Sequence, residues 1–200
     1  MNEDTILGID GTATPTRHSN GNSSRSAMLR FLPLLKPEIA LAIKERRLQV
    51  SDKTIHVTNV PIATLTTVKV FNDDNGQIIG KGNISKGKLE SGVYFALTAI
   101  RVLYGVGNDV TVIDFAAPPA ILRNGEFTLR INGAEAITKA SMECFQAAGN
   151  ANREVGTFYL DNPKLIVDQE PIEFNIEWQT AAPANAYLKV IFIGSTITKS

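Results

Sequence analysis

The sequence predicts a mainly β protein, built as an antiparallel β-sandwich. Three observations support this fold class: apolar residues alternate with polar ones over short runs, turn-forming pairs such as Asn132-Gly133 separate the runs, and helical periodicity is confined to one short segment. Short strands at regular spacing, with turns between them, bury their apolar faces by stacking two sheets. We expect the sandwich to be a single jelly roll, preceded by an extended N-terminal arm and one short helix.

Residues 1–50 are predicted to form the polar arm and the short helix, and residues 51–200 the β-sandwich domain. Thr, Ser, Asn and Gly dominate residues 1 to about 30, and such a composition buries too little apolar surface to offset the entropy of ordering the chain. We therefore expect the arm to order against a neighbour. Its scattered basic residues predict a weak contact with nucleic acid: Arg17, His18, Arg25 and Arg30.

The helix is expected from Pro37 to about Leu48. Pro37 suits the first turn of a helix, because its missing N–H would have no partner there. Ile39 and Ile43 are four residues apart and so share one helical face. Glu38 near the start, and basic residues near the end, carry the charges that the helix dipole favours.

The first strands are expected at residues 54–58 and 66–71, which are rich in β-branched side chains. Residues 72–76, with the sequence Asn-Asp-Asp-Asn-Gly, predict a strong turn between strands, and we interpret the region as a hairpin. Residues 93–104 are apolar on both faces and fit either a central strand or a buried helix. We favour the strand.

The carboxyl-terminal half gives clearer strand signals. Residues 126–131 alternate and have an Asn-Gly pair on either side. Residues 156–167 are interpreted as strand, turn and strand, and residues 187–197 as a long last strand. The clearest alternation is in residues 171–178. The side chains expected to point inward there are Ile172, Phe174, Ile176 and Trp178.

The composition argues against several classes of protein. Twenty basic and twenty acidic residues give a formal net charge of zero, so no overall field attracts nucleic acid or an anionic membrane. Cys144 is the only cysteine, which excludes an intramolecular disulfide. Arg101 and Lys189 interrupt the longest apolar stretches well short of the ~20 residues that span a bilayer, so we expect no membrane span.

Two stretches resemble phosphate-binding loops. Residues 82–88 have the G-x-x-x-x-G-K spacing that wraps nucleotide phosphates, and Asp114 follows an apolar run as a metal-binding carboxylate would. The next residue is Leu89, however, where such loops need a Ser or Thr hydroxyl to bind Mg²⁺. Residues 6–12 resemble the first phosphate loop of actin-like and sugar kinases, but that fold needs two lobes, for which the chain lacks the length. We expect no nucleotide binding.

The remaining candidate residues have structural interpretations that we favour. His18 and His56 have no locally spaced acid that would complete a metal site. Cys144 has no nearby base in the sequence that would activate a thiol. Glu173 and Glu177 lie more than ~10 Å apart along a strand, too far for a paired-carboxylate mechanism without help from another strand. We therefore expect no catalytic, cofactor-binding or metal-ligating residue, no cofactor, and no enzymatic activity.

Three runs in the carboxyl-terminal half carry a resemblance to a known class of protein: Gly125–Leu129, Leu160–Ile166 and Ile172–Trp178. Within the wider pattern of residues 55–197, they resemble the jelly-roll capsid proteins of bacteriophages. The polar arm suits that class, because coat proteins often thread arms under neighbours. The resemblance implies a virion structural protein that assembles through its β domain and its arm, with copies of itself and other virion proteins as partners.

Two functions stay open at this point, ahead of a third, an enzyme built on the sandwich. The first is the virion structural protein, located in the virion and made in the host cytoplasm; the acidic start Met1–Asp4 lacks the charged and apolar regions of a secretory signal. The alternative is a carbohydrate- or ligand-binding β-sandwich, such as a fibre or adhesin domain, which would need an exposed aromatic cluster. The chain has one Trp and four Tyr, and Trp178 is expected to point inward. We favour the virion protein.

Overall fold

The structure is a computed structural model that describes residues 24–45, 47–72, 74–109, 112–146 and 154–199. Within these residues the strands are β1 (Leu48–Pro61), β2 (Thr67–Lys69), β3 (Phe95–Val106), β4 (Glu126–Ile131), β5 (Ala134–Ser141), β6 (Thr157–Ile166), β7 (Ile172–Glu177) and β8 (Ala186–Lys199). The helices are α1 (Ser24–Arg30), α2 (Pro37–Lys44) and α3 (Ala120–Arg123), with the 3₁₀ helices η1 (Leu32–Leu34) and η2 (Met142–Phe145).

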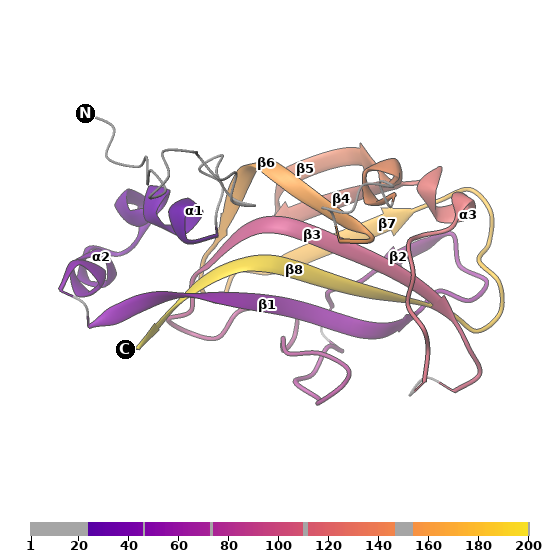
Figure 1. Cartoon of the computed structure of the whole chain (residues 1–200), viewed down its shortest axis with the longest axis horizontal. Helices are drawn as coiled ribbons and strands as arrows, with labels where there is room; N and C mark the ends of the chain where they lie inside the picture. Colours follow the sequence, from indigo (N-terminus) through magenta and orange to yellow (C-terminus); the bar gives the residue numbers. More distant parts are fainter. Residues whose placement is uncertain (1–23, 46, 73, 110–111, 147–153, 200) are drawn as a thin grey trace, which may run out of the picture.

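Two four-stranded antiparallel sheets pack face to face (Figure 1). The first sheet has the strand order β1-β8-β3-β6, and the second has the order β2-β7-β4-β5. The hydrogen-bonded pairs are nested along the chain: β1 with β8, β2 with β7, β3 with β6, and β4 with β5. The prediction of a mainly β, antiparallel sandwich is confirmed.

Aromatic side chains from both sheets meet in the core between them. The ring of Phe174 on β7 lies 5.4 Å from that of Phe127 on β4 and 5.6 Å from that of Phe192 on β8. Such tilted and edge-to-face pairs bury a large apolar area and add attraction between the rings. Residues far apart in the sequence therefore hold the two sheets together.

β7 and the turn after β4 confirm the clearest sequence signals. The four side chains predicted to point inward from residues 171–178 are all buried, whereas Glu177 is exposed. The β4–β5 hairpin turns at Asn132 and Gly133, whose φ angles of 52° and 76° lie in the left-handed region. Asn and Gly tolerate that region best, which is why this pair predicts hairpin turns.

β3 resolves the ambiguous apolar run as a strand, as favoured. It lies between β8 and β6 in the first sheet. Phe95 and Leu97 point into the core between the sheets, and Tyr94 and Ala96 pack against α1 on the opposite face. The run is apolar on both faces because both faces are covered.

One extra residue sits in β3 opposite β8. Leu97 pairs with Gly194 and Ala99 pairs with Ile193, so Thr98 forms a β-bulge. A Cβ atom at Gly194 would overlap the carbonyl oxygen of Ala96. The close approach of the two backbones therefore requires glycine at this position.

The hairpin predicted around the turn at residues 72–76 is wrong, because the strand before this turn pairs with β7. The run at residues 54–58 lies in β1, which pairs with β8 over most of its length, while Val68 of the run at residues 66–71 lies in β2 and pairs with Ile176 of β7. The two runs thus belong to different sheets. Each strand finds a partner distant in sequence, and local turn signals carry no information about such pairing.

The predicted turn within residues 156–167 is also wrong, because β6 runs through it as one strand. Leu97 pairs with Lys164 and Ala99 pairs with Tyr159, so residues 160–163 form an irregularity opposite a single residue of β3. β6 is an edge strand. An edge accommodates extra residues and a proline, because no further strand needs its hydrogen bonds on the outer side.

The structure also corrects the prediction of one short helix. α2 begins at Pro37 as predicted but ends at Lys44, because Leu48 already belongs to β1 and pairs with Lys199 of β8. α1 and α3 are further helices that the sequence analysis missed. No helix in the described ranges is long and apolar enough to cross a membrane.

α1 shortens the predicted polar arm. Ala27 and Met28, with 1% and 0% of their surfaces exposed, are buried against the first sheet. An apolar run this short forms a helix when a sheet face is available to pack against, since tertiary contacts supply most helical stability. Residues 1–23 lie outside the described residues, so the remainder of the arm and the domain division at residue 50 stay predictions.

Candidate functional site

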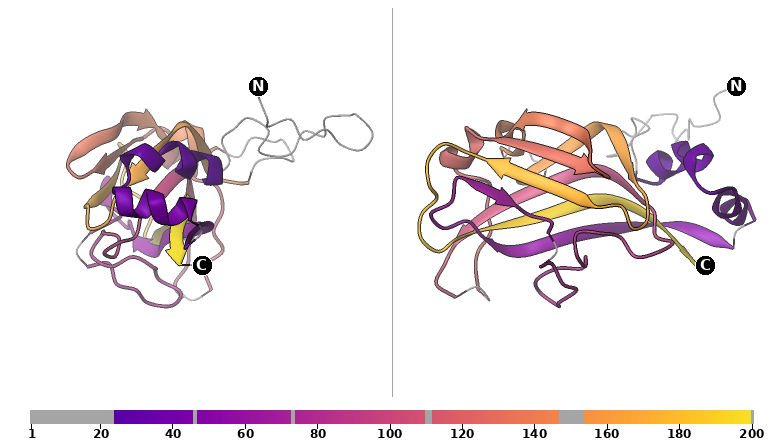
Figure 2. Two further views of the ribbon diagram at one scale, coloured as in Figure 1. Left: turned by 90° about the vertical axis from the view of Figure 1, so that its left-hand side faces the viewer. Right: turned by 180° about the vertical axis from the view of Figure 1, so that it is seen from behind.

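The outer face of the first sheet, turned away from the second sheet, divides into three parts. α1 and α2 lie together at one end of the sandwich (Figure 2) and cover that end of the face. The loop after β3 covers the other end. Between them lies an open region, which is the candidate site.

The helix-covered end is a second, smaller apolar cluster. Ala27 and Met28 of α1 pack against Tyr94 just before β3, Ala96 of β3 and Ile197 of β8, and all five side chains are buried. These β3 and β8 residues face away from the main core. The helices therefore form a third layer on one end of the sandwich.

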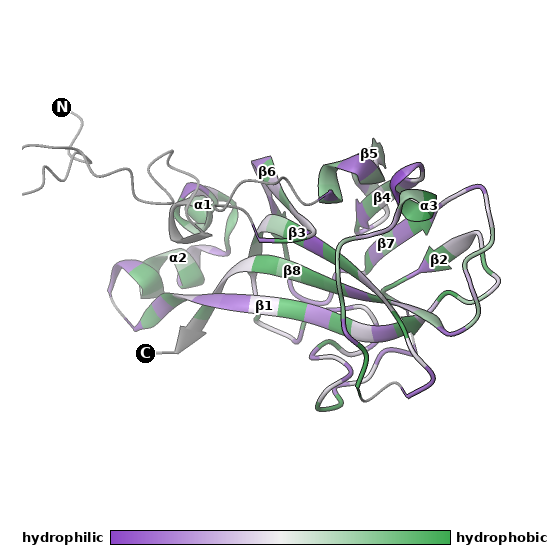
Figure 3. Cartoon of the chain, turned by 45° about the vertical axis from the view of Figure 1, so that its right-hand side comes forward, coloured by the Kyte–Doolittle hydropathy of each residue, from purple (hydrophilic) through white to green (hydrophobic). Residues whose placement is uncertain are grey.

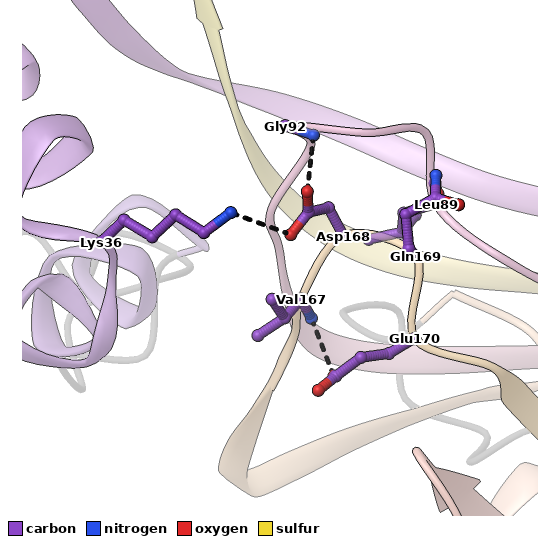
Figure 4. A network of polar contacts seen from close by, with 7 residues as sticks. All are labelled: Lys36, Leu89, Gly92, Val167, Asp168, Gln169 and Glu170. Carbon is purple, nitrogen blue, oxygen red and sulfur yellow. Dashed lines mark hydrogen bonds and ion pairs between the residues drawn. The ribbon is translucent and has the colours of Figure 1, made fainter.

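A polar network ties this layer to both sheets (Figure 4). The carboxylate of Asp168, in the loop between β6 and β7, accepts a hydrogen bond from the backbone N–H of Gly92 at 2.8 Å and lies 4.0 Å from the ammonium of Lys36. Gln169 donates to the carbonyl oxygen of Leu89 at 3.0 Å. This loop crosses from one sheet to the other. The contacts therefore hold together α2, the loop before β3, and the loop between β6 and β7.

The loop-covered end lies next to β3 and β8. Tyr104 and Ala116 exchange backbone hydrogen bonds of 2.9 and 2.8 Å. The ammonium of Lys189 on β8 lies 5.8 Å from the centre of the Phe115 ring, within the range of a cation–π contact. A Cβ at Gly105 would overlap a methyl group of Ile113, so the loop packs directly on the strand.

The open middle of the face is a shallow depression of ≈ 420 Å³ on β1, β8 and β3, which we name the outer-face patch. Its floor is apolar, with the half-buried side chains of Ile191 and Ile193 on β8. Its other side chains are polar or charged. The patch comprises Thr54, His56, Arg101, Glu154, Lys189, Ile191 and Ile193.

Charges at the patch are mainly cationic. The guanidinium of Arg101 lies 3.3 Å from the carboxylate of Glu154 and donates from Nε to the carbonyl oxygen of Val155 at 2.9 Å. Burial, and then the charge of Lys189, lower the pKa of His56 below its ordinary value, so the imidazole is neutral at pH 7. At pH 7 the patch therefore carries the cations of Arg101 and Lys189 and the anion of Glu154.

The segment around Asn83 covers the outer edge of β1, beside the patch. The side-chain amide of Asn83 accepts from the backbone N–H of His56 at 2.8 Å and donates to the carbonyl oxygen of Thr54 at 2.7 Å. Thr58 donates to the carbonyl oxygen of Lys81 at 2.6 Å. These bonds satisfy backbone groups that an edge strand would otherwise present to another chain.

The structure does not build a phosphate site from residues 82–88. Gly82 bridges to Val57 at the edge of β1, and the described residues that follow form turns and then β3, instead of the helix that a phosphate loop needs. Leu89 is buried, with 5% of its surface exposed. Asp114 lies elsewhere, on the loop beside Gly105.

The other sequence candidates are separated in the structure. His18 and residues 6–12 lie outside the described residues, and His56 lies in the outer-face patch. Cys144 is half-buried in η2, and burial raises the pKa of its thiol to about 12. Glu173 lies 3.8 Å from the ammonium of Lys69. Among the residues that the structure describes, no group of three His, Cys, Asp or Glu side chains is placed to hold a metal ion.

Sequence analysis missed the outer-face patch, although a signal for it was present. Residues 190–193 of β8 are all apolar, and a strand with such a run needs cover on both faces. β1 instead has a hydrophilic run at residues 51–54, after which hydrophobic and hydrophilic residues alternate (Figure 3). Which residues of neighbouring strands share a face with Ile191 and Ile193 depends on register, which the sequence does not show.

Comparison with known proteins assigns no family to the chain. No family model matches it, and no curated protein matches it. Its function is therefore inferred from the fold and from the surfaces described above.

Proposed function

We propose that the chain is a virion structural protein, a capsid or capsid-associated subunit of a bacteriophage, and that its sandwich is a single jelly roll. The observation that carries the proposal is the nested pairing of β1 with β8, β2 with β7, β3 with β6, and β4 with β5. One long hairpin wrapped into two sheets has this pairing. Viral capsid domains are prominent users of jelly rolls.

Surface features support a role in assembly. The formal net charge of zero removes the repulsion that keeps copies of a protein apart. The outer-face patch exposes part of two isoleucines between charged groups, a composition suited to a protein interface. The partners would be copies of the chain and other virion proteins, with a weak nucleic-acid contact through the arm. The protein would be made in the host cytoplasm and located in the virion.

The alternative of a carbohydrate-binding or other ligand-binding sandwich has less support. Such sites commonly stack ligands on exposed aromatic rings. Trp178 is buried, with 6% of its surface exposed, and within the described residues Tyr159 is the one exposed aromatic side chain. No second aromatic side chain in the described ranges joins it as an exposed cluster.

The proposal is tested by measuring the size of the protein by light scattering over a dilution series. We expect multimers or particles that dissociate on dilution. Protease should cut residues 1–23 quickly in the dilute monomer and slowly in the assembled state, because contacts with a neighbour offset the entropy of ordering. A chain that stays monomeric at every concentration, with an equally sensitive arm throughout, would contradict the proposal.

A deletion variant sharpens the test. The deletion should end at residue 23, because Ala27 and Met28 of α1 are buried. We expect the shortened protein to keep its circular dichroism spectrum and to melt within a few degrees of the intact monomer, but to lose assembly. Unchanged assembly after the deletion would show that the arm is a disposable linker.

A further inference from the structure

The outer-face patch has an apolar floor that the described residues leave open. At the helix-covered end of the same face, the apolar residues Ala96 and Ile197 are buried beneath α1 and its surroundings. Ile193 lies four residues before Ile197 on β8, or ~13 Å along the strand. It is only half-buried, as is Ile191. The sheet thus continues an apolar stripe beyond the helices that cover its first part.

The segment Asn2–Asp10 has the chemistry that complements this patch. Its sequence is Asn-Glu-Asp-Thr-Ile-Leu-Gly-Ile-Asp, which combines three acidic residues with three large apolar ones. The patch offers isoleucine side chains for the apolar residues. Its two cations, Arg101 and Lys189, outnumber its one anion, Glu154, at pH 7. An acidic, apolar peptide therefore matches both the floor and the charge of the patch.

The chain that connects this segment to the domain joins the domain on the same face as the patch. α1 begins at Ser24 and packs on the outer face of the first sheet. Residues 11–23, which connect the segment to α1, can span up to roughly 45 Å when extended. That is about the length of the 14-residue strand β1 at ~3.3 Å per residue. The segment can therefore reach past the edge of its own sheet to an adjacent molecule.

We propose that the segment Asn2–Asp10 of a neighbouring copy binds the outer-face patch, an inference that rests on the proposed assembly function. Ile6, Leu7 and Ile9 of the segment pack on Ile191 and Ile193. The carboxylates of the segment lie near Arg101 and Lys189 and fix its orientation. Each copy thereby gives one arm and receives another, and so contacts at least one neighbour through this face.

Charge reversal in the full-length chain tests the contact. Lys189→Glu and Asp4→Lys should each lower the association constant, measured by light scattering, by roughly tenfold. The double variant should recover most of the loss, because the opposite charges are exchanged between the partners. The matched control is Lys139→Glu on the exposed surface of β5, which should leave association unchanged.

Mixing the two single variants distinguishes a neighbour's segment from the chain's own. Between copies, the lysine introduced at position 4 of one variant meets the glutamate introduced at position 189 of the other. In the reverse pairing, the unchanged Asp4 of the Lys189→Glu variant meets the unchanged Lys189 of the Asp4→Lys variant. Both pairings join opposite charges, so the mixture should associate more strongly than either variant alone. If the double variant recovers but the mixture does not, the segment binds its own chain and the proposal is overturned.

The outcomes separate this inference from the proposed function. If the intact chain assembles while Lys189→Glu, Asp4→Lys and Ile193→Ser all leave its association unchanged, the patch is not the arm's binding site. The assembly function would then still stand. If the intact chain never assembles, both are overturned. A circular dichroism spectrum for each variant shows whether it is folded, and the double variant guards against a fold defect in one single variant.

Discussion

The two sheets differ in what covers their outer faces, and the difference decides how their strands look in the sequence. On β7 of the second sheet, buried and partly exposed residues alternate, because only the inner face packs in the core. On β3 of the first sheet, every residue from Phe95 to Ile100 is buried, because the main core lies on one face and further cover on the other. Alternation along a strand therefore indicates a sheet with one covered face, and a continuous apolar run indicates a sheet with both faces covered.

The core that the sheets share should give the largest effect. Phe174→Ala on β7 removes a ring that contacts both Phe127 and Phe192. We expect it to lower the free energy of unfolding by ~3–5 kcal/mol, because the cavity cannot fully collapse. Urea denaturation measures the change. Asn175→Ala, on the other face of the strand, should cost under ~1 kcal/mol, and equal losses would show that the faces are misassigned.

The helix layer on the first sheet should give the next largest effect. Met28→Ala removes a fully buried side chain between α1 and the sheet, and we expect a loss of about 2–4 kcal/mol in the free energy of unfolding. The matched control is Leu29→Ala on the same helix, whose side chain is 42% exposed. That control should change stability by about 0.5 kcal/mol or less. Similar small losses for both would mean that α1 adds little to the first sheet.

The bulge between β3 and β8 tests the first sheet at the level of the backbone. Gly194→Ala places a methyl group against the carbonyl oxygen of Ala96, and we expect the strands to shift at a cost of about 1–3 kcal/mol. Gly76→Ala is the control, because its new methyl group would meet only Ile78 at ordinary contact distance, 3.7 Å. A thermal melt of both variants tests this. Equal melting temperatures would show that β3 and β8 approach less closely.

The network between the sheets should give the smallest effect. Asp168→Asn keeps an oxygen that can accept from the Gly92 N–H but removes the charge opposite Lys36, whose side chain is 63% exposed. Exposed ion pairs contribute little, so we expect a loss of about 1 kcal/mol or less. Lys36→Ala should lose less than Asp168→Asn, since it leaves the hydrogen bond from Gly92 to a charged carboxylate, which is stronger than the same bond to a neutral amide oxygen. The reverse order in urea melts would make the ion pair the main contact.

The sequence predicts the presence of individual strands better than it predicts which strands pair, although it missed β5. The alternation of β7 and the turn at Asn132-Gly133 are local properties, and both are confirmed. The pairing of β1 with β8 joins residues more than a hundred positions apart. Local turn signals instead favoured a hairpin within the first strands, which is wrong. Strand existence can thus be predicted from short windows, whereas strand partners depend on the whole chain.

The candidate site could be predicted only in part. The apolar residues 190–193 indicate a strand that needs cover on both faces, but not which residues join it there. Arg101 comes from β3 and His56 from β1, and only the register of three strands brings them to one patch. The sequence analysis missed α1 because Ala27 and Met28 form only a short apolar run within a polar segment. What makes this run helical is its packing on the first sheet, which the sequence does not show.

The cover over the edge of β1 has a consequence for the assembly that we propose. At high local concentration, open sheet edges invite strands from other molecules to add and grow into fibrils. Asn83 already occupies backbone groups of His56 and Thr54 on one edge of the first sheet. The opposite edge, β6, contains Pro163, which has no N–H to donate. In the proposed assembly, crowded copies would thereby be kept from adding strands at these two edges of the first sheet.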